Sequence, residues 1–276
     1  MQPRIIVHGG AGTYTDEHLL KSKPAIQQIC HQAHEFLKSN SAKDTAIFAV
    51  QLLEDCPLFN AGTGSRLQTD GKARMTAAFM ESTRRKFSAV INIENIQNPI
   101  NVAAKLQEEK NSVLGGPEAT KFAHNIGCKE YDPITEEKRL ELNTLTEEKF
   151  GTVGVVVLDS QGKIAAATST GGTSACRPGR VGDVASPAGT YCDTHAGVSC
   201  TGRGEDIQNA VLASRIVFTA QNKTLQDAVK ESFINFNQRK GSAGIIALDH
   251  NGVVVVHHNT PHMVFAYNKQ EEIVTY

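Results

Sequence analysis

Residues 151–159 read Gly-Thr-Val-Gly-Val-Val-Val-Leu-Asp, and this stretch decides the fold of the chain. The run from Thr152 to Asp159 is apolar and rich in β-branched residues, which is typical of a strand buried on both faces. Gly162 then turns the chain, and Lys163 to Thr168 supplies a partner strand. We therefore predict a hairpin of strands that begins directly after Gly151.

The segments around this hairpin predict further strands and helices. A second hairpin is expected from Ala243 to Leu248 and from Val253 to His258, joined through residues 249–252. Apolar residues at helical spacing predict helices elsewhere, and Ser41 is a candidate cap for one of them. The remaining predicted elements are a strand at Pro3–His8 and helices at Pro24–Leu37, Ala42–Leu53, Asn98–Leu106, Pro117–His124, Gly204–Ala220 and Leu225–Phe236. This order of elements supports an α+β or a layered α/β class.

The composition is that of an ordinary globular protein. The chain has 276 residues, of which 40% are hydrophobic and 21% are charged, so it is long enough to bury a substantial core. The formal net charge of −1 leads us to expect no nucleic-acid partner and no membrane partner. The N-terminal segment lacks the apolar run of a signal peptide, so a cytoplasmic location is expected. The six cysteines are dispersed without a CxxC pair, which favours free thiols over a zinc site.

Residues 131–150 differ from the rest of the chain. They carry many Glu, Lys and Arg residues and few large apolar ones. Such a segment gains little from burial and stays solvated. We predict a flexible linker over 131–150, directly before the strand that starts at Thr152, with a loose helix as the alternative for this segment.

Gly151 and Thr152 together suggest a specific chemistry. A threonine hydroxyl is a poor nucleophile until a base removes its proton, and an N-terminal threonine carries such a base in its own α-amino group. An internal threonine must therefore be exposed by cutting the chain before it, and its own hydroxyl can attack the preceding carbonyl. Glycine at 151 leaves that carbonyl unshielded. The alternative is that Thr152 is an ordinary strand residue.

Polar residues downstream favour the chemical interpretation. Thr168 to Gly172 combines hydroxyls with glycines at the end of the second strand. Arg180 can grip a carboxylate and Asp183 an ammonium, although a surface ion pair is the simpler explanation. The turn from Thr201 to Glu205 can direct backbone N–H groups at an oxyanion, or bind a phosphate.

These segments, in this order, resemble the plant-type asparaginase and isoaspartyl peptidase family of N-terminal nucleophile hydrolases. The resemblance covers most of the chain and depends on six motifs taken together. They are His8 to Gly12, Leu53 to Gly62, Gly151 to Gly154, Thr168 to Gly172, Gly179 to Asp183 and Thr201 to Glu205. The resemblance implies a four-layer αββα sandwich of the N-terminal nucleophile hydrolases in one domain, 1–276. It also implies cleavage into an α chain, 1–151, and a β chain, 152–276, with two such αβ units forming a homodimer.

The resemblance further implies roles for individual residues. Thr152 matches the nucleophile, Thr170 the hydroxyl that supports it, and Thr201 and Gly202 the oxyanion hole. The matching substrate-binding positions are Asn60, near the scissile group, Arg180, which holds the substrate carboxylate, and Asp183 and the Gly204 carbonyl, which hold its amine.

A loop that binds sodium is also implied. In the family this loop offers main-chain carbonyls to the ion, and the matching positions here are Leu53, Glu54, Cys56, Phe59, Ala61 and Thr63. The alternative is a simple loop that ends a helix. No organic cofactor is expected. Three histidines near the C-terminus, His257, His258 and His262, lack the spacing of metal ligands and are expected to be packing or surface residues.

The activity that this resemblance implies is hydrolysis of isoaspartyl dipeptides and of L-asparagine, through an aspartyl ester on Thr152. Three alternatives stay open at this point. A glycosylasparaginase-like hydrolase would share the nucleophile but need room for a glycan. A taspase-like endoprotease would have no free substrate amine for Asp183 to bind. An unprocessed, non-catalytic homologue would keep the chain at full length.

Overall fold

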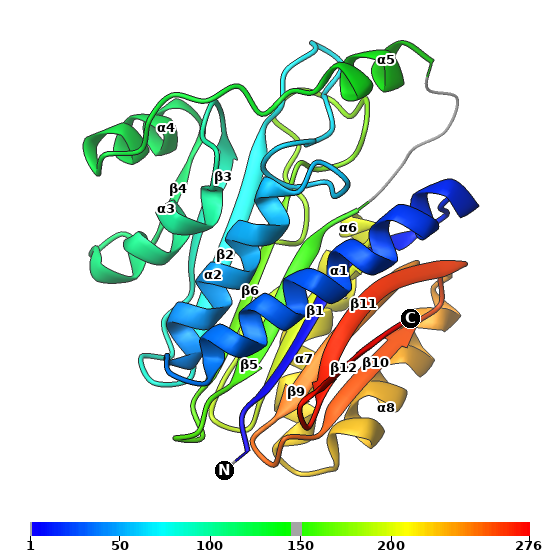
Figure 1. Ribbon diagram of the computed structural model, residues 1–276. Coiled ribbons are helices and arrows are strands. Elements are labelled where there is room, and N and C mark those ends of the chain that lie inside the picture. The colour runs from blue at the N-terminus through cyan, green and yellow to red at the C-terminus, as the bar shows by residue number, and fades with distance from the viewer. Residues whose placement is uncertain (1, 145–150) are drawn as a thin grey trace.

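The fold was analysed in a computed structural model, which describes residues 2–144 and 151–276 (Figure 1). The strands are β1 (Arg4–Gly12), β2 (Met75–Glu81), β3 (Ser88–Ile93), β4 (Val113–Gly115), β5 (Val153–Leu158), β6 (Ile164–Thr170), β7 (Thr190–Cys192), β8 (Ala196–Gly202), β9 (Ala243–Asp249), β10 (Val254–His258), β11 (His262–Lys269) and β12 (Glu272–Thr275). The helices are α1 (Asp16–Leu37), α2 (Ala42–Asp55), α3 (Pro99–Lys105), α4 (Gly116–Asn125), α5 (Glu136–Thr144), α6 (Gly204–Ala210), α7 (Leu212–Ala220) and α8 (Leu225–Gln238), with a 3₁₀ turn η1 at Leu106–Glu108. The α+β class predicted from the sequence is confirmed.

The described strands form two sheets. The larger has the order β12-β11-β1-β5-β6-β2-β3-β4, and all of its neighbours are antiparallel except β3 and β4. The smaller has the order β10-β9-β8-β7 and is antiparallel throughout. Strand β5 lies between β1 and β6, with Val155 opposite both Val7 and Ala167. The hairpin predicted from residues 151–168 is therefore at the middle of the larger sheet.

The continuous apolar run of β5 is explained by burial on both of its faces. Val155 and Val157 pack with α1, α2 and α3 in one hydrophobic cluster. Val156 and Leu158 pack in a second cluster that contains Ile246 of the smaller sheet. Full burial of such a side chain contributes roughly 1.5–3 kcal/mol. A third cluster joins the smaller sheet to α7 and α8, and in Figure 1 these helices lie on the side away from α1 and α2.

The helices agree with the sequence in position but not always in extent. Ser41 caps α2 as predicted, because its Oγ accepts a hydrogen bond from the Asp44 amide at 3.1 Å. Helix α1 begins at Asp16 rather than at Pro24, since Thr15 caps it there, and Pro24 lies exposed inside the helix. The single helix predicted from 204 to 220 is wrong. Val211 adopts a left-handed conformation with φ of 50°, which divides the segment into α6 and α7.

The predicted linker contains a helix. Helix α5 covers residues 136–144, has no buried residue, and carries Glu136 and Glu137 in its first turn, where the helix dipole favours acidic side chains. Residues 145–150 lie outside the described part of the chain, so the flexibility expected of 131–150 stays a prediction. Among the helices that the structure describes, none combines the length and the apolar character needed to cross a membrane.

Candidate active site

Thr152 lies at the start of the central strand β5 and is almost completely buried. The antiparallel register pairs Val153 with Ser169, which places Thr152 beside Thr170 at the end of β6. The Thr152 hydroxyl donates to the Thr170 hydroxyl at an O···O distance of 3.3 Å. The two threonines that the sequence singled out are thus brought together by the hairpin register.

The carbonyl group of Gly151 is held by two side-chain donors. Thr170 Oγ1 donates to the Gly151 oxygen at 3.0 Å, and Asn60 Nδ2 donates to the same oxygen at 2.7 Å. Thr170 Oγ1 also accepts a hydrogen bond from the Gly172 amide at 3.0 Å. A chain of hydroxyl groups therefore runs from Thr152 through Thr170 to the carbonyl oxygen of the peptide bond that precedes Thr152.

Asn60 is fixed by contacts on both ends of its side-chain amide. Its Nδ2 also donates to the Gly172 carbonyl at 2.7 Å, and its Oδ1 accepts from the Arg66 amide at 2.9 Å. Its own carbonyl accepts from the Gly171 amide at 2.9 Å. Because both ends of its side-chain amide and its backbone carbonyl are engaged, Asn60 presents a rigid donor to Gly151.

Asp183 is a buried carboxylate with an unused oxygen. Burial raises its pKa to about 7, against the opposing influence of its own backbone amide and of Arg180. Its Oδ2 has no hydrogen-bond partner within the described residues. A buried carboxylate oxygen without a donor is costly, so this position suits a cationic ligand.

Arg180 pairs with Glu205 rather than with Asp183. Its Nε and Nη2 atoms donate to the two carboxylate oxygens of Glu205 at 2.8 and 2.7 Å. Arginine has five N–H donors, so the Nη1 side of the guanidinium stays available for a second carboxylate. The simple ion pair between Arg180 and Asp183, raised above as an alternative, is not what the structure contains.

Gly204 allows the two anchors to lie side by side. A Cβ atom at this position would lie 2.9 Å from Arg180 Nη2 and 2.9 Å from Asp183 Oδ1. Both distances are too short for a real side chain, so glycine is the residue that fits here. Gly151, Thr152, Arg180, Asp183 and Gly204 all line one small cavity, whose volume is about 10 Å³ in the uncleaved chain.

The two residues predicted for the oxyanion hole take different positions. Gly202 lines this small cavity and has a φ of 131°. Thr201 is fully buried on β8, and its Oγ1 accepts a hydrogen bond from the Ala11 amide at 3.1 Å. In the uncleaved chain the donors on the Gly151 carbonyl are therefore Asn60 and Thr170, while Thr201 and Gly202 lie on the β8 side of the site.

Comparison with known proteins places this arrangement in a family. The family model described as asparaginase matches residues 1–149 and 135–276. The chain belongs to the asparaginase family. It is 39% identical to the isoaspartyl peptidase/L-asparaginase of Synechocystis, covering 97% of this chain and 88% of the relative. It is 38% identical to the plant-type L-asparaginase of Pyrococcus abyssi, covering 96% of each, and 34% identical to the isoaspartyl peptidase/L-asparaginase of Danio rerio, covering 99% and 94%.

These findings confirm the resemblance stated above and identify the chain as an enzyme of the amidohydrolase class. Two side-chain contacts of this asparaginase-family site were missed by the sequence analysis, which had assigned Glu54 only a main-chain carbonyl role in the sodium loop. Glu205 was noted as part of a motif, but its contact with Arg180 was not foreseen. The Glu54 side chain is fully buried and accepts from Ser169 Oγ at 2.6 Å and from the Ile100 amide at 3.1 Å. Burial raises the pKa of Glu54 to about 8.

A buried chain of polar side chains beside Thr152 was also missed. His8 Nε2 lies 2.9 Å from Ser199 Oγ, which lies 2.8 Å from Thr168 Oγ1. Burial lowers the pKa of His8 to about 3, and a contact with the Thr152 backbone opposes this only in part, so the imidazole is neutral. Gly154 makes the chain possible, because a Cβ there would lie 2.0 Å from Ser199 Oγ. The signal in the sequence was a glycine inside an otherwise apolar strand.

The loop after α2 has carbonyls that suit a cation. The Leu53, Glu54 and Cys56 carbonyls accept backbone hydrogen bonds from Cys56, Thr63 and Phe59, respectively. A carbonyl oxygen has a second lone pair, so these bonds leave one acceptor site on each. The carbonyls of the other three predicted positions, Phe59, Ala61 and Thr63, accept no hydrogen bond from the residues that the structure describes. The donor set therefore fits the sodium ion implied by the asparaginase family.

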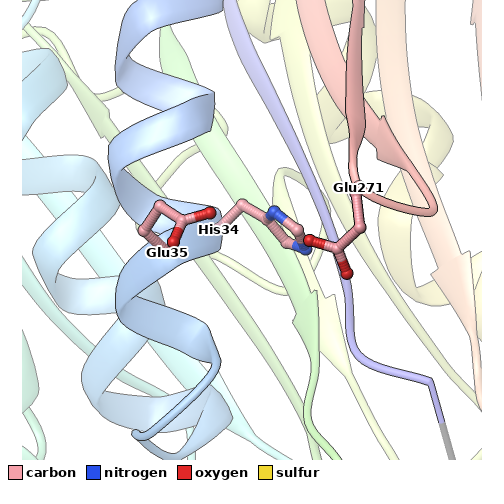
Figure 2. A group of neighbouring side chains, drawn as sticks. All are labelled: His34, Glu35 and Glu271. Atoms are coloured by element: carbon pink, nitrogen blue, oxygen red, sulfur yellow. The ribbon is translucent and has the colours of Figure 1, made fainter.

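One group of metal-type ligands comes together among residues 2–144 and 151–276, and it lies on another part of the molecule. Figure 2 shows His34 of α1 pointing toward Glu271, from the turn between β11 and β12, with Glu35 on the same helix. Lys38 pairs with Glu35 at 2.8 Å and with Glu271 at 2.9 Å. Lys38 supplies the positive charge that a metal ion would bring. The two carboxylates of this cluster are therefore already paired with a cation.

The C-terminal histidines have packing roles. The ring of His257 lies against Phe233, with the ring centres 4.2 Å apart. His262 Nδ1 accepts a hydrogen bond from the Tyr14 amide at 3.3 Å. These contacts agree with the expectation that the histidines are packing or surface residues.

Proposed function

We propose that this protein is a threonine hydrolase that cuts its own chain before Thr152 and then hydrolyses isoaspartyl dipeptides and L-asparagine. The observation that carries the proposal is the pair of donors on the Gly151 oxygen, from Asn60 and Thr170, beside the Thr152 hydroxyl. Two donors aimed at a carbonyl oxygen stabilise the charge that develops when a nucleophile attacks its carbon.

Self-cleavage follows from this chain of hydrogen bonds. Thr152 Oγ1 attacks the Gly151 carbonyl carbon, and its proton moves through Thr170 to the carbonyl oxygen. The C–N bond then breaks as this proton passes from the oxygen to the nitrogen of Thr152, the C=O bond re-forms, and Gly151 is left as an ester on Thr152. Water hydrolyses the ester to a Gly151 carboxylate and the free hydroxyl. The products are the chains 1–151 and 152–276.

The new α-amino group of Thr152 is the base for substrate hydrolysis. It removes the proton of the hydroxyl, which attacks the side-chain carbonyl carbon of the aspartyl group. The leaving amine takes the proton, and an aspartyl ester forms on Thr152. Water then releases aspartate. Thr201 and Gly202 are the proposed donors to the oxyanion in these steps. A cavity of about 10 Å³ is too small for the substrate, which supports the proposal that Gly151 withdraws first.

Arg180, Asp183 and the Gly204 carbonyl are the proposed anchors of the aspartyl group. The open side of the Arg180 guanidinium would hold the α-carboxylate, and the unpaired Oδ2 of Asp183 the α-amine. An internal residue of a protein has neither group free, so this arrangement favours small substrates over an endoprotease. The name of the Synechocystis relative contains both activities, and that of the Pyrococcus abyssi relative contains L-asparaginase, which supports the same substrates here.

The finer structural expectations belong to the same proposal. Three hydrophobic clusters, one between the sheets and one on each outer face, support a four-layer αββα sandwich. The six main-chain carbonyls named above, between Leu53 and Thr63, would hold a sodium ion. The ion would fix the loop that carries Asn60. The homodimer of αβ units stays a prediction.

Intact mass spectrometry tests the proposal. Purified protein is followed over days beside Thr152→Ala, and two fragments that meet between Gly151 and Thr152 are expected in the native sequence alone. The matured protein is then assayed with L-asparagine and a β-aspartyl dipeptide. A single chain in both samples, or a matured protein inert toward both substrates, would overturn the proposal.

A further inference from the structure

A second and larger cavity lies against Gly151. Its volume is about 460 Å³, a size that suits a small ligand. Every residue that lines it precedes the proposed cleavage site, whereas the small anchor cavity is lined from Gly151 onward. Gly151 belongs to the walls of both, so the two cavities meet at the residue that would withdraw after cleavage.

Two cations line this larger cavity at low exposure. The side chains of Arg66 and Lys138 are 9% and 11% exposed, and both contact the Glu141 carboxylate, at 2.5 and 2.8 Å. Lys138 also lies 3.9 Å from the carboxylate of Glu137, but that side chain is 79% exposed and its charge is screened by water. The group formed by Arg66, Lys138 and Glu141, whose side chains are 9%, 11% and 13% exposed, therefore has more positive than negative charge.

Arg66 has donors to spare. Its Nη1 atom donates to Glu141 and, at 3.5 Å, to Ser174 Oγ. Its Nε atom is buried and has no acceptor among the described residues. A buried guanidinium with an unused donor is costly, and a carboxylate is the ligand whose geometry matches it.

Arg66 is also connected, through Asn60, to the Gly151 carbonyl. Its backbone amide donates to Asn60 Oδ1 at 2.9 Å, while Asn60 Nδ2 donates to the Gly151 oxygen at 2.7 Å. Burial, followed by the charges of Lys138 and Arg66, lowers the pKa of His18 on the wall of the same cavity, while the charges of Glu137 and Glu141 oppose this shift. A negatively charged group that extends from the reacting carbonyl into this cavity would meet Arg66.

An isoaspartyl dipeptide has such a group. Its leaving amino acid ends in a free carboxylate, whereas L-asparagine releases only ammonia. Resting on the function proposed above, we propose that Arg66, assisted by Lys138, binds the carboxylate of the leaving amino acid and so selects isoaspartyl dipeptides over L-asparagine. Glu141 occupies part of this subsite in the uncleaved chain.

Substrates that differ at this carboxylate test the inference. The matured enzyme is assayed with β-aspartyl-leucine, β-aspartyl-leucine amide and L-asparagine, beside Arg66→Gln, Arg66→Lys and the control Lys21→Gln. Lys21 lines the same cavity but is exposed and paired with Glu17. In Arg66→Gln the ratio of kcat/KM for β-aspartyl-leucine to that for L-asparagine should fall about 10- to 30-fold, through KM. Arg66→Lys should keep most of the ratio, and Lys21→Gln all of it.

Three results would contradict the inference. Equal losses on the dipeptide and on L-asparagine in Arg66→Gln would make Arg66 merely structural. If that variant fails to mature, the native enzyme decides alone, because equal kcat/KM for the free acid and the amide would also overturn the subsite. A matured native enzyme that hydrolyses neither substrate would instead overturn the proposed function, and this inference with it.

Discussion

The two cavities that meet at Gly151 are built in different ways. The small anchor cavity is formed mainly by residues 170–204, and glycines such as Gly204 bring its charged groups close together. The larger cavity is assembled from β1, α1, the loop after α2 and α5, and its charges belong to long side chains. In the proposed reaction, the half common to all substrates would bind in a tight site with fixed walls. The variable half would bind in a roomier site whose residues lie far apart in the sequence.

Substitution of Asp183 gives the largest expected effect and separates the two cavities. Asp183→Asn should lower kcat/KM for L-asparagine and β-aspartyl dipeptides alike, by about 10²- to 10³-fold, because the substrate ammonium loses its buried charge partner. Self-cleavage should keep its native rate, since Asp183 makes no contact with the Gly151 carbonyl. Steady-state kinetics and mass spectrometry measure the two effects, and cleavage slowed as much as hydrolysis would contradict the separation.

Substitution of Asn60 should slow self-cleavage, which is the step that the Asp183 substitution leaves unchanged. Asn60→Ala removes one of the two donors on the Gly151 oxygen and should slow self-cleavage about 10²- to 10³-fold. The fraction of full-length chain, followed by intact mass spectrometry, gives the rate. Asn222→Ala, at an exposed position after α7, is the matched control. A native cleavage rate in Asn60→Ala would show that Thr170 alone holds the scissile carbonyl.

The two cavities differ in how far they could be predicted from the sequence, because their residues differ in separation along the chain. Arg180 and Asp183 lie three positions apart in one motif, so their partnership in the anchor cavity could be anticipated from the sequence. Arg66 and Glu141 are separated by 75 residues, and Glu54 and Ser169 by 115. Such contacts depend on how whole elements pack, and no local pattern encodes them. The larger cavity was therefore not foreseen.

The fold shows the same limit. The β5–β6 hairpin and the cap of α2 were predicted because each depends on a few neighbouring residues. Strands β2, β8 and β11 were not predicted. Each pairs on one side with a strand close in the chain and on the other side with a distant strand, and that second pairing has no local signal. The break at Val211 was missed because a β-branched residue rarely adopts a positive φ, and here the packing of α6 and α7 imposes it.

Substitution of Glu205, which contacts Arg180 of the anchor cavity, should have a smaller effect on substrate binding. Glu205→Gln should raise KM for L-asparagine about 3- to 10-fold with little change in kcat, because Arg180 loses the bidentate contact that orients its guanidinium. Steady-state kinetics of the matured variant measure this, with Glu231→Gln on α8 as an exposed control. A lower KM would mean that Glu205 competes with the substrate for Arg180 and does not position it.

Glu54 connects the segment that leads to Asn60 with strand β6, which carries Thr170. Its substitution should have the smallest effect. Its carboxyl group, in the last turn of α2 before the loop that leads to Asn60, accepts a hydrogen bond from Ser169, the neighbour of Thr170. Burial raises its pKa from 4.5 to about 8, so the folded protein binds a proton that the unfolded chain releases between these pH values. This group therefore contributes stability that is full below about pH 4.5 and declines as the pH rises toward 8.

Glu54→Gln removes that titration while keeping an oxygen that can accept from Ser169. The Tm of the variant, measured by thermal denaturation, should be close to the native value at pH 5 and exceed it by about 2–5 °C at pH 8. Other titrating groups are common to both proteins, so their influence cancels in the difference. A Tm difference that is the same at pH 5, 6.5 and 8 would show that Glu54 is ionised in the folded state throughout. The tie between the two sides of the site would then be a charged hydrogen bond rather than a neutral one.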